Sequence, residues 1–140
     1  MRPGRSRTLG LALLLGVAVA GARAEAIDWT PFAEEDVVEI LTIDPDGDSR
    51  ETSVWVVVVA DAAYVRTNDS RWLANIRRDP LVRMRVRERE YPLRAEETAD
   101  PATRELVEAS FKAKYGWLQR IMSALRMREP TVLRLQPREQ

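Results

Sequence analysis

The sequence predicts one α+β domain, mainly β: a small closed or split barrel of about six short antiparallel strands with helices between them. Three observations predict this class. Short runs rich in β-branched residues recur, and turn residues separate them. The run at residues 81–87 alternates between apolar side chains and arginines, as a half-buried strand does. Two stretches with apolar residues four apart have helical spacing, and both precede the last strand.

Each strand follows from a local pattern of residue types. Residues 27–35 form an irregular or briefly helical lead-in, and Asp28 or Thr30 is placed to cap a turn before Pro31. The run at residues 54–59 is apolar on both faces, so its strand needs cover from a helix or a second subunit. Strands are expected at residues 37–43, 50–60, 63–66, 81–87, 90–97 and 131–136.

Three helices are expected between these strands. A short helix at residues 71–77 follows the third strand and ends before Pro80, because a residue that precedes proline avoids the helical region. Asp100 caps a second helix, which has proline at its first position, and Gly116 ends it. A third helix at residues 117–127 repeats the apolar spacing. The two long helices therefore come before the last strand.

The first 24 residues have the pattern of a secretory signal peptide. A head with three arginines precedes an apolar run, residues 9–20, that is too short to span a bilayer. Small residues at the expected cut site predict cleavage after Ala24, which leaves one domain at residues 25–140. The expected location is the periplasm or the medium, with no stable membrane anchor after cleavage. An uncleaved N-terminal anchor is the alternative.

Composition excludes several classes of function. The chain has 22 basic and 22 acidic residues, and the expected signal peptide carries four of the arginines, so the mature domain is mildly acidic. This balance argues against a general nucleic-acid binder. The chain has no histidine and no cysteine. It therefore has no Ser-His-Asp triad, no cysteine nucleophile, no zinc site with thiolate or imidazole ligands, and no haem held by histidine or cysteine.

One acidic turn resembles the opening of a calcium loop. Residues 44–48 read DPDGD, but the spacing departs from the calcium pattern and no glutamate stands at its twelfth position. A hairpin turn explains these residues better, because aspartate, proline and glycine all favour turns. No metal site is predicted.

The strongest chemical pattern is the strand, turn and helix at residues 63–80. Residues 68–70, Asn-Asp-Ser, are all good N-cap residues for the short helix. A helix start has free backbone N–H groups, and Arg66 and Arg71 stand beside this one in the sequence. The pattern predicts an anion pocket where the third strand passes into the helix.

The order of elements and these residues resemble the FMN-binding split-barrel superfamily, to which pyridoxamine-phosphate oxidase belongs. In that enzyme a strand leads into a Thr-Asn turn, then Ser-Arg-Lys at a helix start, then Asn-Pro and another strand. Here the order is YVRTN at residues 64–68, SRW at 70–72 and DP at 79–80. The resemblance implies a split barrel, a homodimer, and FMN at the dimer interface.

The same resemblance implies a role for each cofactor-binding residue. Two arginines would neutralise the flavin phosphate, and the polar residues of the turn would donate hydrogen bonds to it. Trp72 replaces the family's phosphate-binding lysine, and Trp72 or Trp55 would pack against the ring system or the partner subunit. Asp69 adds a negative charge that opposes phosphate binding. The implied cofactor-binding residues are Arg50, Thr67, Asn68, Ser70, Arg71 and Trp72.

A closer likeness is to an uncharacterised bacterial branch of this superfamily, and it extends over essentially the whole mature chain. The deazaflavin-dependent reductases look similar in the short helix with its tryptophan. A deazaflavin is therefore the less expected cofactor, and no cofactor is a further alternative. The matching stretches are residues 53–55, 64–66, 72, 111–116 and 131–137.

Three functions follow as hypotheses. The first is an exported flavin-type oxidoreductase, for which substrate and acid–base residues stay open. The second is a split barrel without cofactor that serves as a binding or structural module in the periplasm; Trp72 and Asp69 motivate it. The third is a membrane-surface or partner-binding protein that uses the helix at residues 117–127, for which a core or interface helix is the plainer reading.

Overall fold

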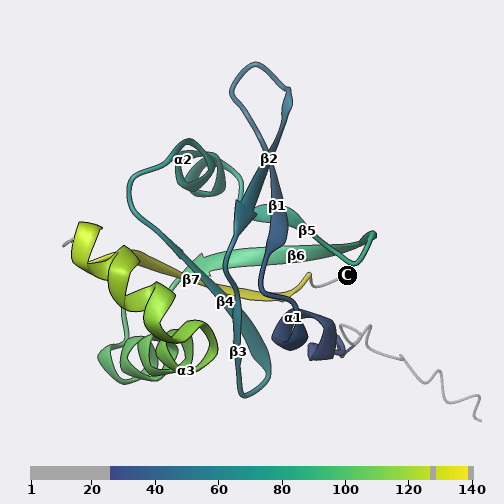
Figure 1. The fold of residues 1–140 in the computed structure, drawn as a ribbon. Helices are drawn as coiled ribbons and strands as arrows, with labels where there is room; N and C mark the ends of the chain where they lie inside the picture. Colours follow the sequence, from purple (N-terminus) through teal and green to yellow (C-terminus); the bar gives the residue numbers. More distant parts are fainter. Residues whose placement is uncertain (1–25, 127–128, 139–140) are drawn as a thin grey trace, which may run out of the picture.

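The computed structural model describes residues 26–126 and 129–138 (Figure 1). Its elements lie in nearly the predicted order. They are α1 (Thr30–Glu34), β1 (Val38–Ile43), β2 (Ser49–Val54), β3 (Val57–Val59), β4 (Ala62–Thr67), α2 (Arg71–Arg78), β5 (Leu81–Val86), β6 (Arg89–Glu97), α3 (Pro101–Arg126) and β7 (Thr131–Pro137). The expected signal peptide lies outside the described residues.

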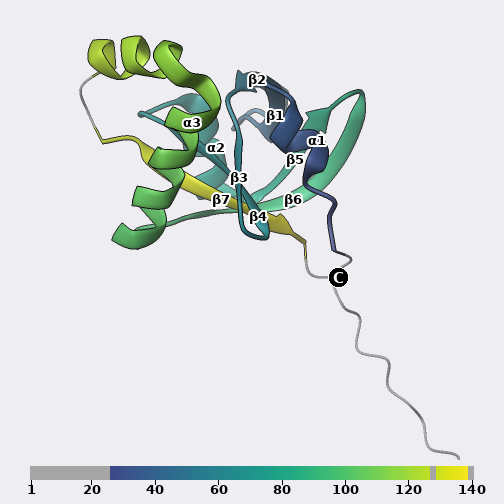
Figure 2. The same ribbon diagram turned by 60° about the horizontal axis from the view of Figure 1, so that its bottom comes forward.

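The strands form one antiparallel sheet in the order β2-β1-β5-β6-β7-β4-β3. The sheet curls into a half-barrel, as Figures 1 and 2 show from two sides. Its two edges, β2 and β3, follow one another directly in the chain. The predicted class, an α+β split barrel, is therefore confirmed, with seven strands instead of about six.

The extra strand comes from a break in the expected strand at residues 50–60. β2 ends at Val54 and β3 begins at Val57. Between them, the backbone nitrogen of Val56 donates a hydrogen bond of 2.9 Å to the hydroxyl of Tyr115 in α3. The strand is interrupted because its backbone here pairs with a helix side chain and not with a neighbouring strand.

The main core lies on the inner face of the curled sheet. In β5, Val82, Met84 and Val86 point inward, as the alternation predicts, and all three are buried. Trp72, Leu73 and Ile76 of α2 join the same cluster, so this helix covers one part of the barrel interior. On the outer face Arg85 pairs with Glu39, Glu51 and Glu90 at 2.7–3.1 Å, as expected for the polar side of a half-buried strand.

A second cluster lies on the outer face, where α3 covers β3 (Figure 2). Val107, Phe111 and Tyr115 of the helix pack against Val57 and Tyr64 of the sheet. Helix α3 is thus the cover that the doubly apolar strand requires.

The two predicted long helices form one element that bends at Gly116, where φ is +56°. Asp100 caps the start of this element, as predicted, because its Oδ2 accepts a hydrogen bond of 2.9 Å from the nitrogen of Thr103. The backbone of residues 117–126 is helical, but the side chains on which the membrane-surface hypothesis depends lie outside the described residues. Within the described part of the chain, no helix has the length and apolar character to cross a membrane.

Candidate functional site

The start of α2 is built as predicted around a capping serine. Ser70 has extended backbone angles, and its Oγ accepts a hydrogen bond of 3.2 Å from the nitrogen of Leu73. Thr67 at the end of β4 lies close by, with its Oγ1 at 3.1 Å from the Oγ of Ser70. Of the three candidate caps Asn68, Asp69 and Ser70, the last one caps the helix.

The β1–β2 hairpin brings a carboxylate against the predicted phosphate arginine. Arg50 donates two hydrogen bonds to Asp44, from Nε to Oδ1 at 2.8 Å and from Nη2 to Oδ2 at 2.9 Å. This is the fork-to-fork geometry that also suits a phosphate group. Asp44 is the first residue of the acidic turn, which forms a hairpin turn with Gly47 at φ +93°.

Helix α2 turns one face toward the same carboxylate. Arg71, Asn75 and Arg78 lie four and three residues apart, so they share that face. The Nδ2 of Asn75 donates to the Oδ1 of Asp44 at 2.8 Å and to the Oγ1 of Thr42 at 3.0 Å. Arg78 donates to the Oδ1 of Asn75 at 3.0 Å and to the carbonyl of Ile43.

The electrostatics of this cluster centre on Asp44. The hydrogen bonds from Arg50 and then from Asn75 hold the pKa of the Asp44 carboxyl below its usual value, and the positive charge of Arg71 adds to the effect. The same hydrogen bond from Arg50 raises the pKa of its guanidinium. Arg50 therefore binds both carboxylate oxygens directly, and Arg71, at an exposed position of α2, acts on them only through its charge. We call Asp44, Arg50, Arg71 and Asn75 the anion corner.

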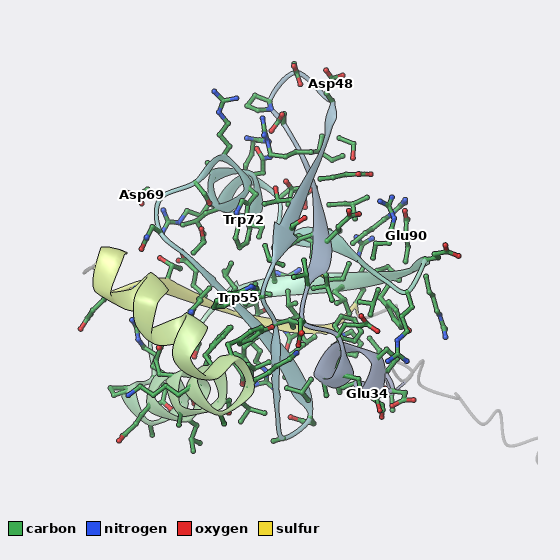
Figure 3. All side chains as sticks on the ribbon, in the orientation of Figure 1. Glu34, Asp48, Trp55, Asp69, Trp72 and Glu90 are labelled. Atoms are coloured by element: carbon green, nitrogen blue, oxygen red, sulfur yellow. The ribbon has the colours of Figure 1, made fainter. Side chains whose placement is uncertain are left out.

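The structure brings some predicted site residues together and places others elsewhere. Arg50 contacts Asp44, Arg71 acts on that carboxylate only through its charge, and Thr67 and Ser70 meet at the start of α2. Asn68 is half-buried in the loop between these groups. Figure 3 shows Asp69 on the outside of that loop and Trp72 on the sheet side of α2, where it is only 7% exposed.

Two other residues of the sequence hypothesis lie on the opposite face, against α3. The guanidinium of Arg66 pairs with Glu108 at 2.6 Å and lies 4.1 Å above the ring of Phe111. Arg66 therefore does not join Arg71 at the helix start. Trp55 stacks on the ring of Tyr115, with centroids 4.3 Å apart.

Sequence reasoning missed the residues at the centre of the anion corner. The turn at residues 44–48 was interpreted only as a turn, and Asp69 was expected to bring the negative charge; the carboxylate that meets the arginines is Asp44. Asn75 follows Arg71 by four residues, so helical spacing alone could have placed it on the same face. Within the described ranges, no group of three acidic side chains is placed to hold a metal ion.

The curled seven-stranded sheet, with a short helix after β4 and a long one before β7, defines a split-barrel protein. The chain belongs to a family of uncharacterised proteins conserved in bacteria, DUF2255, whose model matches residues 28–135. This match agrees with the bacterial branch that the sequence motifs indicated. No curated protein matches the chain.

Solved structures of other proteins share this fold. HutZ, the heme storage protein from Vibrio cholerae, superposes with a TM-score of 0.65 and 16% identity over 79% of this chain and 87% of its own. An F420-H2-dependent reductase, FDR-A, superposes with a TM-score of 0.57 and 14% identity over 73% of this chain and 95% of its own. A candidate pyridoxamine 5′-phosphate oxidase from Listeria innocua superposes with a TM-score of 0.56 and 11% identity over 78% of this chain and 89% of its own. These likenesses confirm the split-barrel architecture that the resemblance implied.

Proposed function

We propose that this chain binds a flavin-type cofactor through its phosphate at the anion corner and acts as an oxidoreductase. One observation carries the proposal: the Arg50 fork of β2 and the Asn75 amide of α2 both donate to one carboxylate, and Arg71 lies one helical turn before Asn75. The two oxygens of Asp44 stand in for two oxygens of a phosphate. A guanidinium fork and an adjacent N–H donor are the groups that bind phosphate in proteins.

Shared architecture supports the cofactor class. Proteins named for F420-H2 and for pyridoxamine phosphate oxidation have this fold. When bound, a flavin or deazaflavin supplies the hydride chemistry, and the protein supplies binding and orientation. FMN is the expected cofactor and a deazaflavin the second. The haem of HutZ is not carried over, because this chain has no histidine or cysteine to hold one as a ligand.

A second candidate function is a split barrel without cofactor, used as a binding or structural module. The specific observation in its favour is that two predicted cofactor contacts are already taken within the chain. The fork of Arg50 is filled by Asp44, and Trp72 is packed into the main core. On this reading the anion corner only ties α2 to the β1–β2 hairpin.

A flavin titration separates the two functions. The purified protein is titrated with FMN, with riboflavin, which lacks the phosphate, and with F420, and absorbance and fluorescence are recorded. We expect FMN to bind about tenfold or more tightly than riboflavin, because a charged hydrogen bond to phosphate contributes about 1.5–3 kcal/mol. A colourless protein that binds none of the three ligands at high micromolar concentration would favour the module without cofactor.

A matched pair of variants on α2 tests the location of the site. We expect Arg71→Gln to weaken FMN binding about tenfold. Arg77→Gln removes the same charge from the same helix, but Arg77 pairs with Glu97 on another face, so it should leave the affinity unchanged. Equal losses in both variants would mean that only the general charge of the helix attracts the ligand.

We propose further that the domain is exported and forms a homodimer. Export rests on the signal-peptide pattern of residues 1–24, and N-terminal sequencing of protein recovered from the periplasm or medium tests it, with Glu25 as the expected first residue. The dimer is supported by Ile43 and Leu81, which are 49% and 42% exposed on the neighbouring strands β1 and β5. Two large apolar side chains exposed on neighbouring strands favour contact with a second copy.

A further inference from the structure

We propose that Asp44 is an internal competitor for the anion corner: its carboxylate fills the site in the free protein, and a phosphate-bearing ligand binds by displacing it. The inference rests on the proposed function, since it concerns the same site. It goes further because it assigns a regulatory role to a residue of this chain and predicts a variant that binds better than the natural protein.

The carboxylate of Asp44 can leave without unfolding the hairpin. The turn is fixed by backbone bonds, from the nitrogen of Asp44 to the carbonyl of Asp48 at 2.8 Å and from Gly47 to the carbonyl of Asp44 at 2.9 Å. The side chain of Asp44 takes no part in these bonds, and 19% of it is exposed. A rotation of the side chain therefore moves its carboxylate into water while the backbone stays in place.

The donors that Asp44 would leave behind remain in position. Asn75 is only 3% exposed, and its amide keeps two other partners, because Nδ2 donates to Thr42 and Oδ1 accepts from Arg78. Its N–H group thus continues to point to the place of the carboxylate oxygen. The Arg50 guanidinium, with a side chain 29% exposed, stays beside it as an open fork.

Charge balance favours a phosphate over the carboxylate. Arg50 brings one positive charge into contact with Asp44, and Arg71 of α2 adds a second at longer range, against the one negative charge of Asp44. The charge of Asp46 also acts on Arg50 from the turn, but its Oδ1 accepts a hydrogen bond from the backbone nitrogen of Asp48. A dianionic phosphate neutralises both arginines and offers a third oxygen, so it can replace the carboxylate when its concentration is high enough.

The consequence is that removal of the competitor should strengthen binding. Asp44→Asn keeps the shape of the side chain but removes its charge, so it competes less for Arg50. We expect this variant to bind inorganic phosphate and FMN about tenfold more tightly than the natural chain, as read from the dissociation constants in isothermal titration. Asp44→Ser, with a shorter side chain, should show a similar gain, and circular dichroism establishes that both variants are folded.

A matched control lies in the same turn. Asp48 stands at the free tip of the hairpin (Figure 3) and is exposed, and among the described residues its side chain makes no hydrogen bond. Asp48→Asn removes the same charge without opening the site, so its phosphate affinity should stay within about twofold of the natural value. A gain as large as that of Asp44→Asn would overturn the proposal, because attraction by net charge would then explain both.

A measurement on the natural chain does not depend on how the variants fold. Saturating phosphate should shift the side-chain amide resonance of Asn75 in a nitrogen–proton correlation spectrum, because its N–H exchanges a carboxylate oxygen for a phosphate oxygen. An unmoved Asn75 resonance, or an Asp44→Asn variant that gains no affinity, overturns the proposal.

The outcomes also separate this inference from the proposed function. If the natural chain binds FMN and Asp44→Asn binds it no better, the cofactor role stands and the proposed role of Asp44 as a competitor is wrong. If the natural chain binds inorganic phosphate with the expected Asn75 shift but does not bind FMN, and Asp44→Asn binds phosphate more tightly, Asp44 is an internal competitor and the cofactor role of the natural chain is wrong. If no form binds either ligand, both are wrong.

Discussion

The hydroxyl of Tyr115 lies 2.9 Å from the backbone nitrogen of Val56, 59 positions earlier in the chain. It also lies within donating distance of the carbonyl of Asp36, at 2.8 Å. The ring of Tyr115 is stacked on Trp55 with an angle of 5° between the planes. This one side chain therefore joins α3 to the point where the strand breaks between β2 and β3.

Removal of that hydroxyl should destabilise the fold. Tyr115→Phe keeps the stacked ring but leaves the buried Val56 N–H without its acceptor. We expect the free energy of unfolding in urea to fall by about 1–3 kcal/mol, the usual cost of an unpaired buried polar group. Tyr91→Phe is the control, since Tyr91 is also buried and no hydrogen bond to its hydroxyl occurs among the described residues. A comparable loss in both variants would contradict this account.

The same hydroxyl makes the free energy of unfolding depend on pH in the alkaline range. Burial raises the pKa of Tyr115 to about 12 from its ordinary value of 10.0, and the hydrogen bond that its oxygen accepts from the Val56 N–H acts against this rise. The folded protein therefore holds this proton more tightly than the unfolded chain does, so the contribution is complete below pH 10 and is lost as the pH rises toward 12. Urea unfolding across this range should show a steeper decline for the natural chain than for Tyr115→Phe; parallel declines would refute the assignment.

A half-buried ammonium group holds the lead-in segment to the sheet. The Nζ of Lys114 donates to the carbonyls of Phe32, Glu35 and Val56 at 2.6–3.0 Å. We expect Lys114→Met to lower the free energy of unfolding by about 2–3 kcal/mol, because hydrogen bonds to charged groups are stronger than neutral ones. Lys112→Met, at an exposed position on the same helix, should change it by less than about 0.5 kcal/mol.

The exposed pair on β1 and β5 predicts where a dimer forms. Ile43→Glu should convert the dimer to monomer in light scattering after gel filtration, because a buried, unpaired carboxylate is costly at an apolar interface. Leu106→Glu is the control, since Leu106 is 59% exposed on α3. If only Leu106→Glu dissociates the dimer, the interface lies on α3. If the natural chain is monomeric, the proposed homodimer is wrong.

Local patterns predicted what depends on near neighbours. The alternation in β5, the caps at Ser70 and Asp100, and the end of α2 before Pro80 all depend on residues a few positions apart, and each is found. Such features follow from backbone sterics and from free N–H groups at helix starts, which act wherever the chain then folds.

Contacts between elements far apart in the chain could not be predicted from the sequence. The strand break at Val56 depends on Tyr115, and the anion corner depends on how α2 lies over the β1–β2 hairpin. Asn75 reaches Asp44 across 31 positions, and no local signal distinguishes this aspartate from any other in a turn. Trp72 was expected at a ligand or a partner, but its large apolar surface is buried in the core of its own chain.

The place of β7 governs when the fold can be completed. This last strand lies between β6 and β4, so the sheet consists of two unconnected parts until it is inserted. Assembly of the barrel must therefore wait for the C-terminal segment to leave the ribosome, and shortened chains that lack it should expose unpaired edges and aggregate.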